Sequence, residues 1–188
     1  MKSVLILVLL AFTLCFPGGW VKRSINENDL DIEQSFKLVS SNYAKSNDVD
    51  VDDLIRLTVY SQVVNGMNYN VTFIDSTAEK PKIHEYTIYK SLENTNDNQF
   101  SIRDHEVYET PGELIPTNDP KLVPLENSLY SFLKNTKERL NFISLAYPIE
   151  NYATKFYVIS ANTADGQHQY IVCQDKDSEV YYSFAKLK

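Results

Sequence analysis

Residues 59–71 read Val-Tyr-Ser-Gln-Val-Val-Asn-Gly-Met-Asn-Tyr-Asn-Val and carry the clearest local signal in the chain. The dipeptide Asn65-Gly66 is the strongest short-range indication of a tight β-hairpin turn. Apolar residues alternate with polar ones on both sides of this turn, at Ile55, Leu57 and Val59 before it and at Met67, Tyr69, Val71 and Phe73 after it. Such alternation predicts two strands, each with one buried face.

An amphipathic helix is predicted before this hairpin. Apolar residues recur three or four positions apart, at Ile32, Phe36, Val39 and Tyr43. This spacing places them along one side of a helix. Asp29 and Asp31 near the start suit the positive end of the helix dipole, and the polar residues 46–48 are expected to end the helix. Two more strands are predicted after the hairpin, at 84–89 and 100–108.

The second half of the chain repeats this plan with little repeat of sequence. Residues 110–124 hold four of the seven prolines, a density that excludes helix and central strand and predicts a linker. A second helical stripe then begins at Leu125, Leu129, Phe132 and Leu133 and continues loosely to Leu140. Four strands are predicted after it, at 142–145, 155–160, 169–173 and 180–184, with a turn at Asp165-Gly166. One helix followed by antiparallel strands, occurring twice, predicts an α+β fold.

The composition sets broad limits on function. A chain of 188 residues, 43% of them hydrophobic, is long enough for one large or two small packed domains. Its formal net charge of -7 argues against nucleic acid and anionic membrane surfaces as main partners, because both require a basic face; we therefore expect no nucleic-acid and no membrane partner. Near the start, Lys2 precedes an apolar run from Val4 to Cys15 that is too short to span a bilayer and is typical of a secretory signal. We expect residues 1–15 to be removed and the mature protein, beginning at Phe16, to be secreted.

Secretion affects the interpretation of two more sites. Once Cys15 has left with the signal, Cys173 is the remaining cysteine, which excludes an internal disulfide. The strand-like run around Cys173 favours a buried structural cysteine over a reactive thiol. Asn70-Val71-Thr72 is an N-glycosylation sequon, and Asn70 is expected to point away from the core because its neighbours are apolar.

The pentapeptide Gln62-Val63-Val64-Asn65-Gly66, at a hairpin tip that follows an amphipathic helix, resembles the cystatins, which inhibit papain-like cysteine proteases. In that family an antiparallel sheet wraps around one long helix. The inhibitory face combines a glycine near the N-terminus, a first hairpin of the form Gln-x-Val-x-Gly and a second hairpin that often carries Pro-Trp. The resemblance implies two cystatin-like modules, at 16–109 and 125–188, joined by the linker at 110–124.

The resemblance is specific for the first module. Gln62, Val64 and Gly66 match the three fixed letters of the first hairpin, and Gly18-Gly19 supplies the N-terminal glycine. The predicted second hairpin, at 92–98, is polar and lacks Pro-Trp. Trp20, the one tryptophan, lies in the N-terminal segment 16–23, which we call the trunk. In the second module the corresponding segment 148–154 has no Gln, Val or Gly. We therefore expect the second module to be degenerate.

The resemblance to cystatins implies a reversible, non-covalent inhibitor of papain-like, cathepsin-type proteases. The trunk at Gly18 and Gly19 and the hairpin tip, formed by Gln62, Val63, Val64, Asn65 and Gly66, would block the active-site cleft. A valine at such a tip is hard to bury in its own core and contributes about 1.5 kcal/mol or more when a partner covers it.

Other functions stay open at this point. Asn47 matches a segment that serves, in some secreted cystatins, as bait for the asparagine-specific protease legumain, although a polar loop that ends a helix explains the same letters. A cystatin-like fold also suits a non-inhibitory binding module. A third alternative is a metallocarboxypeptidase inhibitor similar to latexin, which has two cystatin-like halves.

The sequence contains none of the common enzyme motifs. Gly-x-Ser-x-Gly, a phosphate-binding loop, His-Glu-x-x-His and paired-cysteine metal motifs are all missing. The three histidines, His84, His105 and His168, are scattered along the chain. We therefore expect no enzyme activity, no catalytic residue, no metal ion and no cofactor.

Overall fold

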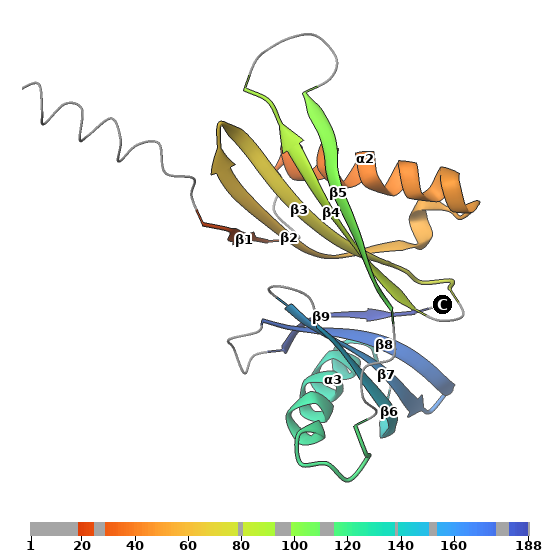
Figure 1. Ribbon diagram of the computed structural model, residues 1–188. Coiled ribbons are helices and arrows are strands. Elements are labelled where there is room, and N and C mark those ends of the chain that lie inside the picture. The colour runs from red at the N-terminus through yellow and green to blue at the C-terminus, as the bar shows by residue number, and fades with distance from the viewer. Residues whose placement is uncertain are drawn as a thin grey trace, which may run out of the picture.

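Two antiparallel sheets lie face to face between two helices, which gives four layers (Figure 1). A computed structural model describes residues 19–24, 29–78, 81–92, 99–109, 115–137, 139–150, 154–175 and 181–187. The predicted signal at 1–15 lies outside the described residues. More of the described chain is in strands than in helices. The α+β class is confirmed as an arrangement of two sheets and two helices.

The first sheet has five strands in the order β1-β2-β3-β4-β5. Their bounds are β1 Val21–Arg23, β2 Leu54–Val64, β3 Gly66–Asp75, β4 Lys82–Lys90 and β5 Phe100–Glu109. Helix α2 (Leu30–Asn47) and a short 3-10 turn (Val51–Asp53) connect β1 to β2. The predicted helix and all four predicted strands of this half are present.

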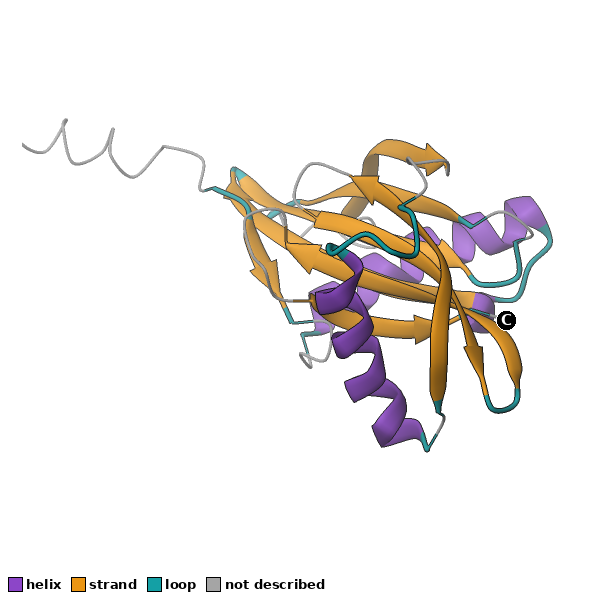
Figure 2. Ribbon diagram, turned by 90° about the horizontal axis from the view of Figure 1, so that it is seen from below, coloured by secondary structure: helices purple, strands orange, loops and turns teal. Residues whose placement is uncertain are grey.

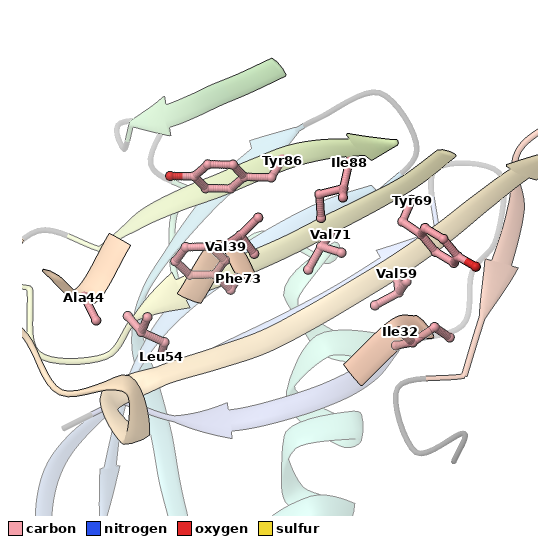
Figure 3. Packing of buried hydrophobic residues seen from close by; sticks show 10 residues of the cluster. All are labelled: Ile32, Val39, Ala44, Leu54, Val59, Tyr69, Val71, Phe73, Tyr86 and Ile88. Carbon is pink, nitrogen blue, oxygen red and sulfur yellow. The ribbon is translucent and has the colours of Figure 1, made fainter. Parts of the chain in front are cut away.

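Helix α2 begins and ends where its sequence allows it to. The Asp29 carboxylate caps the start by accepting hydrogen bonds from the backbone N–H groups of Asp31 (2.9 Å) and Ile32 (3.4 Å). The helix ends at Asn47 because Asp48 adopts a left-handed conformation with a φ of 56°. Ten buried residues pack α2 against the sheet (Figure 3): Ile32, Val39, Ala44, Leu54, Val59, Tyr69, Val71, Phe73, Tyr86 and Ile88.

The second sheet has four strands in the order β6-β7-β8-β9 and is covered by helix α3 (Leu122–Thr136). The strand bounds are β6 Leu140–Glu150, β7 Thr154–Thr163, β8 Gly166–Asp175 and β9 Tyr181–Lys186. Leu122, Leu125, Leu129 and Leu133 on α3 pack against buried residues of β6, β7 and β8. Seen from below, α3 crosses the near side of the strands and α2 lies on their far side (Figure 2).

The two sheets share a hydrophobic core of their own. Leu57, Ile74 and Ile83 of the first sheet pack against Phe156, Val158, Ile171, Cys173 and Leu187 of the second half. Every one of these side chains is at most 6% exposed. Cys173 is therefore buried, as predicted, and burial raises the pKa of its thiol. The two halves form a single packed body through this shared core.

This packing corrects the prediction that each hairpin strand has one buried face. In β2, Leu57 contributes to the core between the sheets, whereas Val59 faces α2. An irregularity in pairing between Arg56 and Thr58 shifts the alternation by one residue, so Leu57 and Val59 point to opposite sides. Both faces of the strand are covered because the second sheet lies on the face away from α2.

The predicted boundaries of the second helix are also wrong. Helix α3 begins at Leu122, inside the predicted linker, and includes Pro124 in its first turn. Proline is tolerated there because the first N–H groups of a helix have no partner within it. The helix ends at Thr136, where Lys137 has a φ of 63°, so Leu140 starts β6 instead of continuing the helical stripe.

Strand β6 likewise extends further than predicted, through Pro148 to Glu150, where the sequence suggested a hairpin tip. Proline is compatible with this position because β6 lies at the edge of its sheet. The turn that follows, at 151–153, lies outside the described residues. Among the residues that are described, no helix has both the length and the apolar character needed to cross a membrane.

Replacing Phe156 by Ala is expected to lower the free energy of unfolding by about 3–5 kcal/mol, because the ring is fully buried in the shared core. Denaturant unfolding followed by Trp20 fluorescence and by circular dichroism measures this change. Both signals are expected to move together in one transition. The control Tyr130→Ala removes a side chain that is 56% exposed on α3 and is expected to cost less than about 0.5 kcal/mol. Two separate transitions would contradict a shared core.

Candidate functional site

Three segments meet at one end of the first sheet, which we call the hairpin edge: the start of β1, the β2–β3 turn and the end of β4 (Figure 1). Arg23 pairs with Val59 and Val21 with Ser61, so the chain before β1 runs toward the β2–β3 turn. Met67 pairs with Lys90, which also places the end of β4 at this edge. The antiparallel register alone therefore gathers segments that are far apart in sequence.

The β2–β3 turn is tight and depends on glycine. Strand β2 ends at Val64 and β3 begins at Gly66, so Asn65 alone connects them. Gly66 has a φ of 131°, a conformation that side-chain-bearing residues rarely adopt. A Cβ at this position would lie 2.5 Å from the carbonyl oxygen of Lys90 and 2.7 Å from the Tyr89 side chain. The predicted tight turn at Asn65-Gly66 is present, and the close approach of β4 adds a second reason for glycine.

Tyr89, on the neighbouring strand β4, stabilises the turn. Its hydroxyl donates a hydrogen bond to the backbone carbonyl of Asn65. The guanidinium of Arg103, on β5, lies 4.8 Å from the centre of the Tyr89 ring. Nothing in the sequence motif indicated this contact, because it depends on the register of β3 against β4.

The matched hairpin residues divide between the two faces of the sheet. Gln62 pairs with Asn68 and accepts a hydrogen bond of 3.2 Å from its side-chain amide. Val63 is 60% exposed, whereas Val64 is partly buried and Asn65 is exposed. One apolar side chain thus projects into solvent at the tip, next to a backbone that the turn and Tyr89 hold in place.

The N-terminal trunk lies beside this turn. Gly19 is exposed with open space around it, and Trp20 is partly buried next to β1. Gly18 lies outside the described residues, as do residues 93–98 of the predicted second hairpin. At the start of that hairpin, Leu92 is 71% exposed. The structure therefore brings Gly19 to the hairpin edge with residues 62–66.

The first turn of α2 contacts the two strands next to the hairpin edge, β3 and β4. The Asp31 carboxylate accepts a hydrogen bond of 3.0 Å from the Tyr69 hydroxyl and forms a 2.6 Å ion pair with Lys90. Burial, with the Asp31 charge as a further cause, raises the pKa of Tyr69. One carboxylate at a helix start thereby links α2 to β3 and β4 directly below the tip.

Asn47, the candidate legumain residue, lies at the opposite end of the sheet. It is the last residue of α2, is exposed, and donates a 2.9 Å hydrogen bond from its side-chain amide to the Tyr43 carbonyl oxygen. A protease that binds asparagine in an extended segment would have to unwind this last turn. The structure does not bring Asn47 together with the hairpin residues.

The sequon residue Asn70 points away from α2, because it alternates with Tyr69 and Val71, which face the helix. The face on which it lies is nevertheless partly covered, and Asn70 is only partly exposed. Its side-chain nitrogen, the atom that carries a glycan, donates a 2.5 Å hydrogen bond to Glu85. Glycosylation would replace this contact.

A histidine pair near Asn47 is a feature that sequence reasoning missed. Nδ1 of His84 and Nε2 of His105 are 3.3 Å apart, and His105 stacks on Tyr86 with 3.9 Å between ring centres. A hollow with a volume of about 560 Å³ lies beside them and reaches Asn47. The pKa of His84 is lowered from 6.5 to about 4, mainly because the ring is buried and secondly because His105 lies nearby. The charge of Asp75 acts in the opposite direction. The two histidines are 21 positions apart in sequence, and pairing of β4 with β5 brings them together.

No protein-family model matches the chain, and a search of curated proteins finds no match. Within the described ranges, no cluster of three or more His, Cys, Asp or Glu side chains is arranged to hold a metal ion.

Replacing Gly66 by Ala is expected to destabilise the chain more than replacing Gly166 by Ala. Both glycines have nearly the same φ, 131° and 129°, but a Cβ at Gly166 meets nothing within 4 Å. Gly166→Ala therefore measures the backbone cost alone, about 1–3 kcal/mol. Gly66→Ala adds the clash with Lys90 and Tyr89. Equal losses in the free energy of unfolding would show that the clash is relieved and that Tyr89 does not brace the turn.

Acidification is expected to destabilise the fold through His84. The unfolded chain binds a proton on this residue near pH 6.5 and the folded chain only near pH 4, so stability is lost as the pH falls between these values. The shift corresponds to about 3 kcal/mol. Chemical denaturation of the parent and of His84→Phe at pH 7 and pH 4 measures it: the variant should lose less stability by about this amount. An identical pH dependence for both proteins would contradict the assignment.

Proposed function

We propose that this chain is a secreted, cystatin-like inhibitor that blocks papain-like, cathepsin-type cysteine proteases reversibly and without covalent chemistry. The single observation that carries the proposal is that the trunk and the Gln62–Gly66 turn meet at the hairpin edge, where Val63 projects into solvent. The turn would enter the protease cleft above the catalytic cysteine. The trunk at Gly18 and Gly19 would occupy the substrate side.

The physical properties of the hairpin edge support this role. A tip fixed by Gly66 and braced by Tyr89 loses little conformational entropy on binding, which leaves more of the contact energy available for affinity. Val63 offers apolar surface that its own fold leaves uncovered. Such a tip excludes substrate from a cleft while presenting no scissile bond in the position for attack. Hydrophobic burial and shape would carry the affinity.

Two rival functions use the same fold differently. The shared core of two helix-plus-sheet halves favours an inhibitor of metallocarboxypeptidases similar to latexin, which is likewise built from two halves. A binding module that inhibits nothing is the other rival. The latexin-like function does not require the residues of the Gln62–Gly66 turn, so substitution at the tip separates it from the main proposal. A binding module that inhibits nothing is separated by the absence of papain inhibition.

The test is titration of active papain with the mature protein, starting at Phe16, and with a variant carrying both Val63→Asp and Val64→Asp. Loss of about 1.5 kcal/mol at each valine predicts inhibition about 100-fold weaker. Val107→Asp is the control, because Val107 is 43% exposed on β5 away from the hairpin edge. It should leave inhibition unchanged.

The outcomes discriminate between the three functions. Equal inhibition of papain by the parent and the double variant would contradict binding through the turn. Absence of inhibition at micromolar protein, with the chain shown to be folded, would reject the inhibitor proposal. Inhibition of a metallocarboxypeptidase that the double variant retains would then support the latexin-like function.

A further inference from the structure

The N-terminal trunk is held by the second half of the chain as well as by the first. Lys22, in the middle of β1, extends toward Asp175 at the end of β8. Its Nζ atom lies 2.9 Å from both carboxylate oxygens of Asp175. The two residues are 153 positions apart in sequence, so this contact exists because the two sheets pack together.

A second contact reinforces the first. Tyr60, the register partner of Lys22 on β2, places its hydroxyl 2.9 Å from the Thr154 hydroxyl and donates a 3.4 Å hydrogen bond to Asp175. Thr154 is fully buried. We call these four residues, Lys22, Tyr60, Thr154 and Asp175, the trunk clamp. It joins two strands of the first sheet to two strands of the second.

The opposite face of β1 is tied to the first half. Arg23 points away from Lys22, because successive side chains on a strand alternate, and it forms a 3.1 Å ion pair with Asp29, the cap of α2. Strand β1 has only three residues and lies at the sheet edge, so its backbone pairing is short. Its side-chain contacts therefore matter for its position, and each half of the chain supplies one of them.

We infer that the second sheet positions the N-terminal trunk, with Lys22 and Asp175 as the positioning residues. This inference rests on the proposed function, because it assigns the second half a role in the same inhibitory edge. The second half then needs no inhibitory turn of its own. By fixing Lys22 and Arg23 in β1, the clamp also protects this dibasic pair from trypsin-like proteases.

The first experiment follows the trunk itself in the full mature chain. Trp20 is the only tryptophan and lies two residues before Lys22, so its fluorescence anisotropy reports trunk order. Asp175→Asn is expected to lower this anisotropy and to speed trypsin cleavage after Lys22 and Arg23 by about fivefold, as for a partly exposed ion pair. Lys82→Gln is the matched control, since it breaks the exposed 2.6 Å pair with Glu109 at the other end of the sheet.

The second experiment measures inhibition of papain. Lys22→Gln and Asp175→Asn should each weaken inhibition about fivefold, and the double variant should be no weaker than either single one. In a chain that starts at Ser24, which lacks the trunk, Asp175→Asn should have no effect. A merely structural role for Asp175 would weaken that shortened chain as well.

These readouts separate the inference from the proposed function. If the parent chain fails to inhibit papain, the proposed function fails, whereas the anisotropy and trypsin rates still test the clamp. Unchanged anisotropy and cleavage in Asp175→Asn would overturn the inference. Additive losses in the double variant, or an equal loss in the shortened chain, would overturn it too.

Discussion

The face-to-face packing of the two sheets is the constraint on which the rest of the molecule depends. Each sheet has one helix, which covers one face and leaves the other face apolar. The shared core of Leu57, Ile74 and Ile83 with Phe156 and its neighbours covers both remaining faces at once. Within the described residues Cys173 is a free, buried cysteine, and this buried surface holds the halves together.

The same packing organises the hairpin edge. Registers within the first sheet set the turn beside the trunk, and the second sheet reaches the trunk through Asp175. The tip of the turn therefore combines a constrained backbone at Gly66 with an exposed apolar side chain at Val63. A rigid tip with uncovered apolar surface is suited to a concave partner, because little order has to be imposed on binding.

Much of the secondary structure follows from local chemistry. Helix α2, its Asp29 cap, the glycine turn and strands β2 to β5 are all encoded by spacing and turn residues that act over a few positions. Contacts between distant segments were not predictable in this way. Leu57 changes faces through a shift in strand pairing, Pro124 is compatible with the first turn of a helix, and Tyr89 reaches Gly66 only through the β3–β4 register. The turn residues of the candidate site were identifiable from sequence, whereas Tyr89, which stabilises the turn, was not.

The most direct test of binding through the hairpin edge is hydrogen–deuterium exchange of the chain starting at Phe16, with and without papain whose catalytic cysteine is replaced by alanine. Slower exchange is expected at residues 19–23 and 60–67 in the presence of the protease. Residues 42–47 and 103–108, near the histidine pair, should exchange at the same rate in both samples. Unchanged exchange at the turn, or protection confined to the histidine end, would contradict binding through the hairpin edge.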